Sequence, residues 1–404
     1  MHTVVIIGAG AAGLMAAGSL ADCRVVVLER NEKAGKKLYI SGKGRCNVTN
    51  DCAPDEFMKH VVRNPKFLYS AINGFTPEDT QTLLRDWGVS TKTERGNRVF
   101  PVSDKASDVI RARVRRAEKN GADIRYNTRV MRVQKTDIGF LVQTDGETLV
   151  CEKLLIATGG KSYSATGSTG DGDAFARALG HSVVQPRPSL VPFVTEEDLS
   201  VLAGLTLKNV TVRMEAGNKT YSEFGELLFT HNGVSGPTVL RLSAYASDLP
   251  MPMRLYIDLK PALDNETLDK RITSDFVANA NRQLKNALDM LLPKALILPV
   301  LRQSGLSLDK KVNVLTKGER QQLVHTVKNF SCRVTATEPL DNAIVTAGGV
   351  DVCEVNPKTM QSKICPNLYF AGEVLNVDAL TGGFNIQIAF STAQAAAKAM
   401  RNKD

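Results

Sequence analysis

The pattern of apolar and polar positions in the first thirty residues predicts a strand, a glycine turn, a helix and a second strand. Residues 4–7 form an uninterrupted apolar run, which is typical of a parallel strand buried on both faces. The sequence GAGAAG at 8–13 follows and opens a stretch of helical character. A second apolar run at 25–28 ends at Glu29. This order is that of a βαβ unit that binds a dinucleotide.

Each glycine of the turn has a separate task in such a unit. Gly8 permits the tight turn, Gly10 lets the backbone approach a pyrophosphate, and Gly13 lets the helix pack closely on the strand. Glu29, at the end of the second strand, can accept hydrogen bonds from ribose hydroxyls. We therefore expect this segment to bind the pyrophosphate and one ribose of a dinucleotide.

Two later segments have the same texture and are expected to join the first in one discontinuous cofactor domain. Strand-like runs at 128–135 and 139–144 precede an apolar strand at 153–157. Near the C-terminus, residues 367–373 resemble a strand that runs into a glycine turn. A long helix rich in small residues is expected at 384–401.

The region between these segments has a different pattern. Short β-like runs at 190–194, 210–214 and 254–259 predict an antiparallel sheet or barrel. The next part is helical, because leucines recur at helical spacing at 284–292 and the sequence at 316–319 resembles a capping box. The fold class is therefore α/β, with a dinucleotide-binding domain interrupted by a sheet region and a helical region.

Composition leaves the choice of partner open at first. The net charge of +9 could indicate nucleic acid. The basic residues are scattered, however, except for Arg111, Arg113, Arg115 and Arg116, which fall in a helical pattern and are expected to form a solvated face. An anionic cofactor and substrate would use part of the excess charge. We therefore expect a small-molecule substrate and no nucleic-acid partner.

The chain carries no signal for export or for a membrane span. Its apolar start lacks a basic leader, and no window reaches the roughly 18 uninterrupted apolar residues that a spanning helix needs. The seven cysteines are irregularly spaced, with no CxxC pair and no zinc-like cluster. We expect a cytoplasmic protein with free, mostly buried thiols and no metal site.

The glycine-rich sites favour FAD over NAD as the resident cofactor. Only one dinucleotide fingerprint is present, while the turn at Gly372 and Glu373 and the helix that begins at Gly383 are placed to hold the other half of a long dinucleotide. A helix N-terminus favours negative charge, which a reduced flavin carries at its N1–C2=O edge and a reduced nicotinamide does not. If NAD(P)H reduces this flavin, it must bind transiently over the ring; the alternative is that the substrate itself reduces the flavin.

Six separated motifs resemble the HI0933-like flavoproteins, also called the YhiN or BaiN family. They are GKKLYISGKGRCNVTN at 35–50, RVFP at 98–101, ATGGKSY at 157–163 with TGSTGDG at 166–172, LFTH at 228–231 with SGP at 235–237, AGEV at 371–374, and GGFN at 382–385. Asn376 and Ala379 stand where the family pattern leads us to expect Asp and Gly. FAD binding is expected regardless of these two departures, which affect only the local flavin contacts at this turn.

This resemblance implies a glutathione-reductase-type FAD-binding Rossmann domain with an inserted antiparallel β-barrel-like domain and an inserted helical domain. The implied boundaries are 1–188 and 340–404 for the FAD domain, 189–262 and 328–339 for the barrel, and 263–327 for the helices. The implied FAD contacts are Gly8, Gly10, Ala12, Gly13, Glu29, Arg30, Lys37, Ser41, Gly42, Arg45, Cys46, Asn47, Val130, Thr158, Gly159, Gly372, Glu373, Gly383, Phe384, Asn385 and Ile386.

Two residues are candidates for proton transfer, and each also has an alternative interpretation. His231 could donate a proton or bind substrate, or it could be a hydrogen-bonded turn histidine. Tyr163 could donate a proton to a carbonyl or alkene, or it could cover the cofactor. Cys46 lacks a second cysteine at redox spacing and is expected to be a packing residue.

The resemblance and the residues together predict an FAD-dependent oxidoreductase that transfers hydride through flavin N5. NAD(P)H-dependent reduction of an activated C=C bond in a small or steroid-like molecule is the leading hypothesis. A flavin-dependent amine oxidase or dehydrogenase is one alternative, and an RNA-associated flavoprotein, motivated by the net charge, is another.

Overall fold

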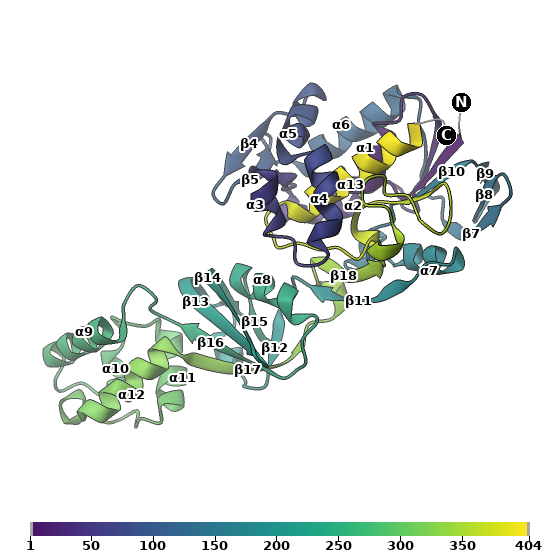
Figure 1. Cartoon of the computed structure of the whole chain (residues 1–404). Coiled ribbons are helices and arrows are strands. Elements are labelled where there is room, and N and C mark those ends of the chain that lie inside the picture. Colours follow the sequence, from purple (N-terminus) through teal and green to yellow (C-terminus); the bar gives the residue numbers. More distant parts are fainter. Residues whose placement is uncertain (1–2, 402–404) are drawn as a thin grey trace. The chain divides into compact units, whose positions relative to one another are not determined.

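A computed structural model describes residues 3–401. The contacts within the chain divide it into two compact units, which are described separately (Figure 1). Unit 1 comprises Met1–Ser189 and Pro339–Asp404, and unit 2 comprises Leu190–Glu338. No helix among residues 3–401 is long and apolar enough to cross a membrane.

The centre of unit 1 is a five-stranded parallel sheet with the strand order β19-β10-β1-β2-β6. Its strands come from the three segments that the sequence pattern grouped together, and the predicted Rossmann-type α/β fold is confirmed. The central strands are buried along most of their length, which matches their apolar runs. The strands are β1 (Thr3–Ile7), β2 (Arg24–Leu28), β6 (Asp123–Arg125), β10 (Lys153–Ile156) and β19 (Leu368–Phe370).

Helix α1 (Ala11–Ala17) follows the glycine turn and packs between two longer helices, α6 (Ala106–Lys119) and α13 (Phe384–Arg401) (Figure 1). The observed range of α13 matches the expected helix at 384–401. Its alanines and small polar residues allow close packing, and most of its side chains are buried.

One residue of α6 corrects the sequence analysis. Arg113 was expected on a solvated helix face, but it is completely buried. Its guanidinium lies 3.6 Å from the centre of the Phe390 ring on α13, and Nη1 donates to the carbonyl of Ala11. Burial lowers the pKa of Arg113 to about 9. The basic residues of α6 therefore do not form one charged surface.

The described residues of unit 1 also form three small antiparallel sheets and five further α-helices. The helices between residues 54 and 86 had no counterpart in the sequence analysis. The sheets pair β3 (Thr49–Asn50), β5 (Arg98–Pro101) and β4 (Thr91–Glu94); β7 (Val130–Thr136), β8 (Gly139–Thr144) and β9 (Thr148–Cys151); and β11 (Val183–Ser189) with β18 (Val345–Val350). The helices are α2 (Lys36–Ile40), α3 (Pro54–Met58), α4 (Pro65–Gly74), α5 (Pro77–Asp86) and α7 (Asp171–Ala178).

Unit 2 contains a closed six-stranded antiparallel barrel, as the fold-class prediction required. Buried residues alternate with more exposed ones along its strands, which places one face of each strand in the barrel core. Helix α8 (Pro237–Ala246) packs against β14. The strands, in barrel order, are β12 (Phe193–Thr195), β15 (Gly233–Ser235), β14 (Lys219–Phe229), β13 (Thr206–Ala216), β16 (Met253–Asp258) and β17 (Phe330–Thr337).

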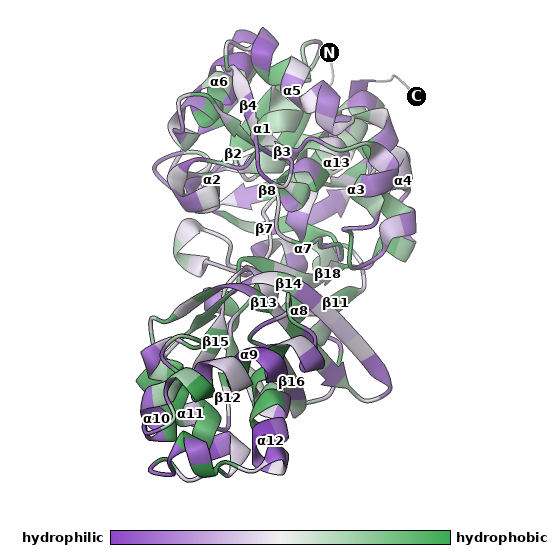
Figure 2. Ribbon diagram, turned by 90° about the vertical axis from the view of Figure 1, so that its left-hand side faces the viewer, coloured by the Kyte–Doolittle hydropathy of each residue, from purple (hydrophilic) through white to green (hydrophobic). Residues whose placement is uncertain are grey.

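Four helices are inserted between β16 and β17. Only one turn of helix forms in the predicted leucine-rich stretch, and the largely hydrophobic helix α11 begins after Pro293 (Figure 2). The capping box at Thr316 and Glu319 is present with both of its hydrogen bonds. Barrel and helices share one hydrophobic cluster, so contacts join them in a single unit. The helices are α9 (Asn265–Ala278), α10 (Leu284–Ala287), α11 (Lys294–Ser304) and α12 (Lys317–Lys328).

Candidate functional site

The glycine turn between β1 and α1 is the start of the candidate site, and its glycines fall into two groups. Gly8 and Gly13 are needed by the fold: a Cβ on Gly13 would lie 1.8 Å from the carbonyl oxygen of Gly8, and one on Gly8 would lie 2.7 Å from the oxygen of Ala157. Gly10 is different, because a Cβ there would meet no described atom within 4 Å. The open space in front of Gly10 fits the pyrophosphate of a dinucleotide.

Glu29 is buried at the end of β2 and connects this turn to the next loop. Its carboxylate accepts hydrogen bonds from the amide of Ala9 at 2.9 Å, and from the amide and side chain of Asn31 at 2.9 and 2.7 Å. Each carboxylate oxygen has two lone pairs, so an acceptor site remains for a ribose hydroxyl. The sequence pattern found Glu29 but did not indicate that it also holds the glycine turn.

The residues expected near the adenosine lie around the same end of the sheet. Arg30 donates to Thr169 at 2.6 Å and forms an ion pair with Asp171 at 3.0 Å. Val130 is buried at the start of β7, and Thr158 and Gly159 follow β10 and are half-buried. Arg30, Thr158 and Gly159 follow the carboxyl ends of parallel strands, where open α/β sheets bind ligands, whereas Val130 begins a strand of a separate antiparallel sheet.

A second group of candidates forms a polar network. The ammonium of Lys37 lies 2.8 Å from a carboxylate oxygen of Glu373 and 2.6 Å from the hydroxyl of Ser162. Glu373 also accepts from the amide of Thr346 at 2.8 Å. Lys37 and Glu373 keep 27% and 20% of their side-chain surface exposed, so both remain accessible to a ligand.

The loop at 41–47 has an unusual backbone. Gly42, Lys43 and Cys46 are left-handed, and Ser41 donates to the carbonyl of Leu38. Arg45 is held by Glu94 and Asp104 at 2.7 and 3.2 Å. Cys46 has no exposed surface and burial raises its pKa, which suits packing better than redox chemistry.

Asn47 offers an observation that points to a ligand. Its Oδ1 is buried and accepts no hydrogen bond from the described residues, while a Cβ on Gly383 would lie 2.9 Å from it. A buried acceptor without a donor is costly. The N3–H of a flavin is a donor of the required kind, so the chemistry of Asn47 is compatible with a flavin ligand.

The residues at the start of α13 support the turn that carries Ala379. Asn385 accepts from the amide of Ala379 at 2.9 Å and donates to its carbonyl at 2.7 Å. Phe384 is buried and stacks on His60 with 4.4 Å between ring centres. Ile386 is half-buried, and Gly372 and Gly383 have the positive φ values that favour glycine.

The sequence analysis missed a buried ion pair between Arg63 and Asp378, the residue directly before Ala379. Asp378 is completely buried and accepts from Arg63 at 2.7 and 2.8 Å and from the hydroxyl of Ser189 at 2.7 Å. Three distant segments of unit 1 meet at this carboxylate. No local pattern announces such a contact, because its partners are 315 and 189 positions away.

The two candidate proton donors belong to different units. Tyr163 lies in unit 1, half-buried, on a loop where its own φ is +54°. His231 lies in unit 2 and is exposed after β14. Their roles stay predictions.

Comparison with known protein families shows which family the chain belongs to. The model of the HI0933-like protein Rossmann domain matches residues 2–399. The chain belongs to the HI0933-like family. Membership of this flavoenzyme family implies FAD as the cofactor and an oxidoreductase activity, as the sequence motifs predicted.

Relatives of known activity align with this HI0933-like protein over nearly its whole length. Ribosomal RNA dihydrouridine synthase of Escherichia coli K12 is 36% identical over 401 residues, which is 98% of this chain and 96% of the relative. The 3-dehydro-bile acid delta(4,6)-reductase of Clostridium scindens is 30% identical over 407 residues and 99% of both chains.

A solved structure extends the likeness to the fold alone. The 3-ketosteroid-delta4-(5alpha)-dehydrogenase of Rhodococcus jostii RHA1 superimposes on this HI0933-like protein with a TM-score of 0.51 at 15% identity, over 98% of this chain and 96% of the other.

Proposed function

We propose that this protein is an FAD-dependent reductase of a C=C bond conjugated to a carbonyl group, and that its substrate is a uracil base in ribosomal RNA. The observation that carries the proposal is a shared chemistry among full-length relatives. Making dihydrouridine saturates the C5=C6 bond of uracil, next to the C4 carbonyl, and the relative from C. scindens is named as a reductase of a steroid-like dehydro compound. Both names fit reduction of an activated alkene.

The choice of RNA over a steroid-like molecule rests on two observations. The relative named for ribosomal RNA is 36% identical, against 30% for the bile acid reductase. The net charge of +9 also suits a polyanionic substrate. The proposed RNA substrate reverses the order of the hypotheses drawn from sequence, which favoured a small-molecule substrate. A steroid-like substrate is now the second candidate. We also propose that the protein acts in the cytoplasm.

In this proposal the residues of unit 1 bind and orient the cofactor. The backbone at Gly10 approaches the pyrophosphate, Glu29 accepts from the adenosine ribose, and the Asn47 Oδ1 accepts from the pyrimidine edge of the flavin. FAD supplies the two-electron transfer when it is bound.

The ribityl chain of the cofactor and the reduction itself also need polar groups. The pair of Lys37 and Glu373 provides polar groups for the ribityl chain. Reduction of an alkene also needs a proton, for which the Tyr163 hydroxyl is the candidate within unit 1 and His231 the candidate within unit 2.

The test uses the purified holoprotein under anaerobic conditions. NADH or NADPH should bleach the flavin, and an unmodified ribosomal RNA transcript should restore its colour while gaining 2 Da in one uridine-containing fragment by mass spectrometry. Gly10→Val is the matched control without cofactor. Restoration of colour by a 3-oxo-Δ4 steroid and not by RNA would replace the proposal with the second candidate. If neither nicotinamide bleaches the flavin, the reductase proposal fails.

Two variants then assign the proton donor. Tyr163→Phe and His231→Gln each remove one candidate without changing the overall size of the side chain much. The variant that lacks the donor should keep flavin reduction by NAD(P)H but lose reoxidation by the alkene substrate by about 100-fold or more. Unchanged reoxidation in both would exclude both residues.

A further inference from the structure

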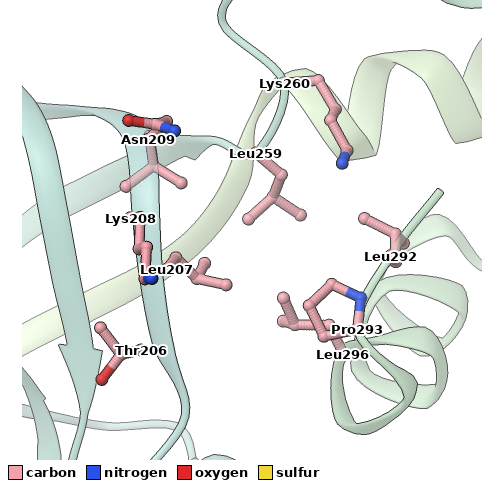
Figure 3. A pocket seen from close by; sticks show the side chains of 10 residues that line it. Thr206, Leu207, Lys208, Asn209, Leu259, Lys260, Leu292, Pro293 and Leu296 are labelled. Atoms are coloured by element: carbon pink, nitrogen blue, oxygen red, sulfur yellow. The ribbon is translucent and has the colours of Figure 1, made fainter.

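Unit 2 contains a pocket that the proposed function does not use. It has a volume of about 260 Å³ and lies where the strand β13 and the end of β16 face the start of helix α11 (Figure 3). Its apolar lining comes from Leu207, Leu259, Leu292, Pro293 and Leu296. Figure 3 shows these side chains gathered around a common space. The volume lies below the roughly 300–1,000 Å³ of pockets for drug-sized ligands, so it suits a small ligand.

A bulge in β13 shapes one wall of this pocket. The pairing of β13 with β14 shifts register between Leu207 and Val210, which leaves Lys208 and Asn209 outside the ladder. Both residues line the pocket and are exposed. Bulges of this kind redirect side chains and occur often beside binding sites. Here the bulge sets a lysine and an amide at the edge of an apolar cavity.

The second cation of the pocket is Lys260, which follows β16. Figure 3 shows its side chain extending toward the space above Leu292 and Pro293. Burial lowers the pKa of Lys260, and the nearby charge of Arg271 lowers it further. Neither Lys208 nor Lys260 has an acidic partner among the described residues, whereas Arg271 and Lys328 pair with Asp275 and Asp258.

We infer that this pocket binds a small amphipathic carboxylate, with its apolar chain against the leucines and its acidic group at Lys260, and with Lys208 adding positive charge on the opposite wall. The apolar lining excludes a fully hydrated inorganic anion as the best ligand, because such an ion gains nothing from the leucines. The two unpaired lysines disfavour a neutral apolar ligand, because it would bury part of Lys260 without a counter-charge. A carboxylate on an unbranched chain satisfies both parts of the site through charge-assisted hydrogen bonds. The inference is independent of the proposed reductase activity.

The experiment is calorimetric titration of the holoprotein with sodium decanoate and, separately, with methyl decanoate, its neutral ester. Decanoate should bind at one saturable site, and the ester at least tenfold more weakly. Lys260→Gln should raise the Kd for decanoate about tenfold, and Lys208→Gln should raise it less, since Lys208 is more exposed. Lys219→Gln, the same change of charge on an exposed lysine of β14, is the control and should leave the Kd unchanged.

Three outcomes would overturn the inference. They are no saturable binding of decanoate at millimolar concentration, equal affinity for acid and ester, or a Kd that Lys260→Gln leaves unaltered. Circular dichroism of each variant establishes that its fold is intact. Flavin reduction by NAD(P)H and reduction of RNA are measured on the same samples. A failure of decanoate to bind the pocket is therefore distinguishable from a failure of the proposed reductase function.

Discussion

Gly10 and Gly13 belong to the same turn but should fail in opposite ways when they are substituted. Gly10 has φ −84° and ψ −160°, an extended conformation open to any residue, and a Cβ there meets no described atom within 4 Å. Gly10→Val should therefore cost the apoprotein about 1 kcal/mol or less, mainly through a poorer helix N-cap. A Cβ on Gly13 would lie 1.8 Å from the oxygen of Gly8. Gly13→Ala should cost about 3 kcal/mol or more through overpacking.

The effect on FAD should be the reverse. The valine at position 10 fills the space that the pyrophosphate needs, so the backbone amides of the turn can no longer reach it. Hydrogen bonds to a charged group contribute about 1.5–3 kcal/mol each. Loss of two such bonds amounts to about 3–6 kcal/mol, which raises the Kd for FAD by more than 100-fold.

Two measurements on apoprotein separate these effects: urea denaturation for stability, and quenching of FAD fluorescence for the Kd. The expected result for Gly10→Val is a folded, colourless protein. Wild-type affinity for FAD in Gly10→Val would refute the placement of the pyrophosphate. A loss of stability as large as that of Gly13→Ala would show that the space at Gly10 is needed by the fold itself.

Three further predictions concern buried polar groups of unit 1. Glu29→Gln should destabilise the apoprotein by about 2–4 kcal/mol in urea denaturation. Ala9 and Asn31 donate to different oxygens of the Glu29 carboxylate, and an amide has only one oxygen to offer them. As a control, Glu32→Gln, which changes an exposed carboxylate nearby, should leave the denaturation midpoint unchanged. Asp378→Asn should cost about 3–5 kcal/mol, because it leaves the charge of Arg63 buried; a wild-type midpoint would contradict this. Burial lowers the pKa of His181, so below about pH 6.5 the unfolded chain binds more protons than the folded protein, and the free energy of unfolding should fall as the pH falls. His181→Gln should flatten this pH dependence. An unchanged slope in that variant would contradict the prediction.

Local sequence patterns predicted the elements whose stability is itself local. The turn at 8–13, the helix at 384–401 and the capping box at Thr316 all depend on residues within one or two turns of each other. Local signals also existed for helices that the sequence analysis left out: α4 and α5 begin at Pro65 and Pro77, and Thr76 with Asp79 forms a second capping box.

The remaining errors came from contacts between distant segments. Arg113 was assigned to the surface because it is basic, but it shares the buried face of α6 with Val109 and Ile110, where Phe390 on α13 and the carbonyl of Ala11 receive its guanidinium. The leucines at 284–292 have helical spacing, but only α10 (Leu284–Ala287) is helical there, and the rest of the stretch forms turns before Pro293. Among the candidate site residues, Glu29 was found from its position, while its contact with Ala9 required the three-dimensional structure.

The pairing of β10 with β19 has a consequence for synthesis of the protein. Unit 2 is continuous in sequence and complete at residue 338, whereas the parallel sheet of unit 1 needs a strand at 368–370 and a helix that ends at 401. Domains fold as units while the chain emerges, so the barrel can fold before the sheet is complete. A released chain that ends at residue 338 would carry all the strands of the barrel and a β10 edge without its β19 partner. The sheet of the cofactor unit, although its first strand is β1, can therefore be completed only after the barrel segment has been made.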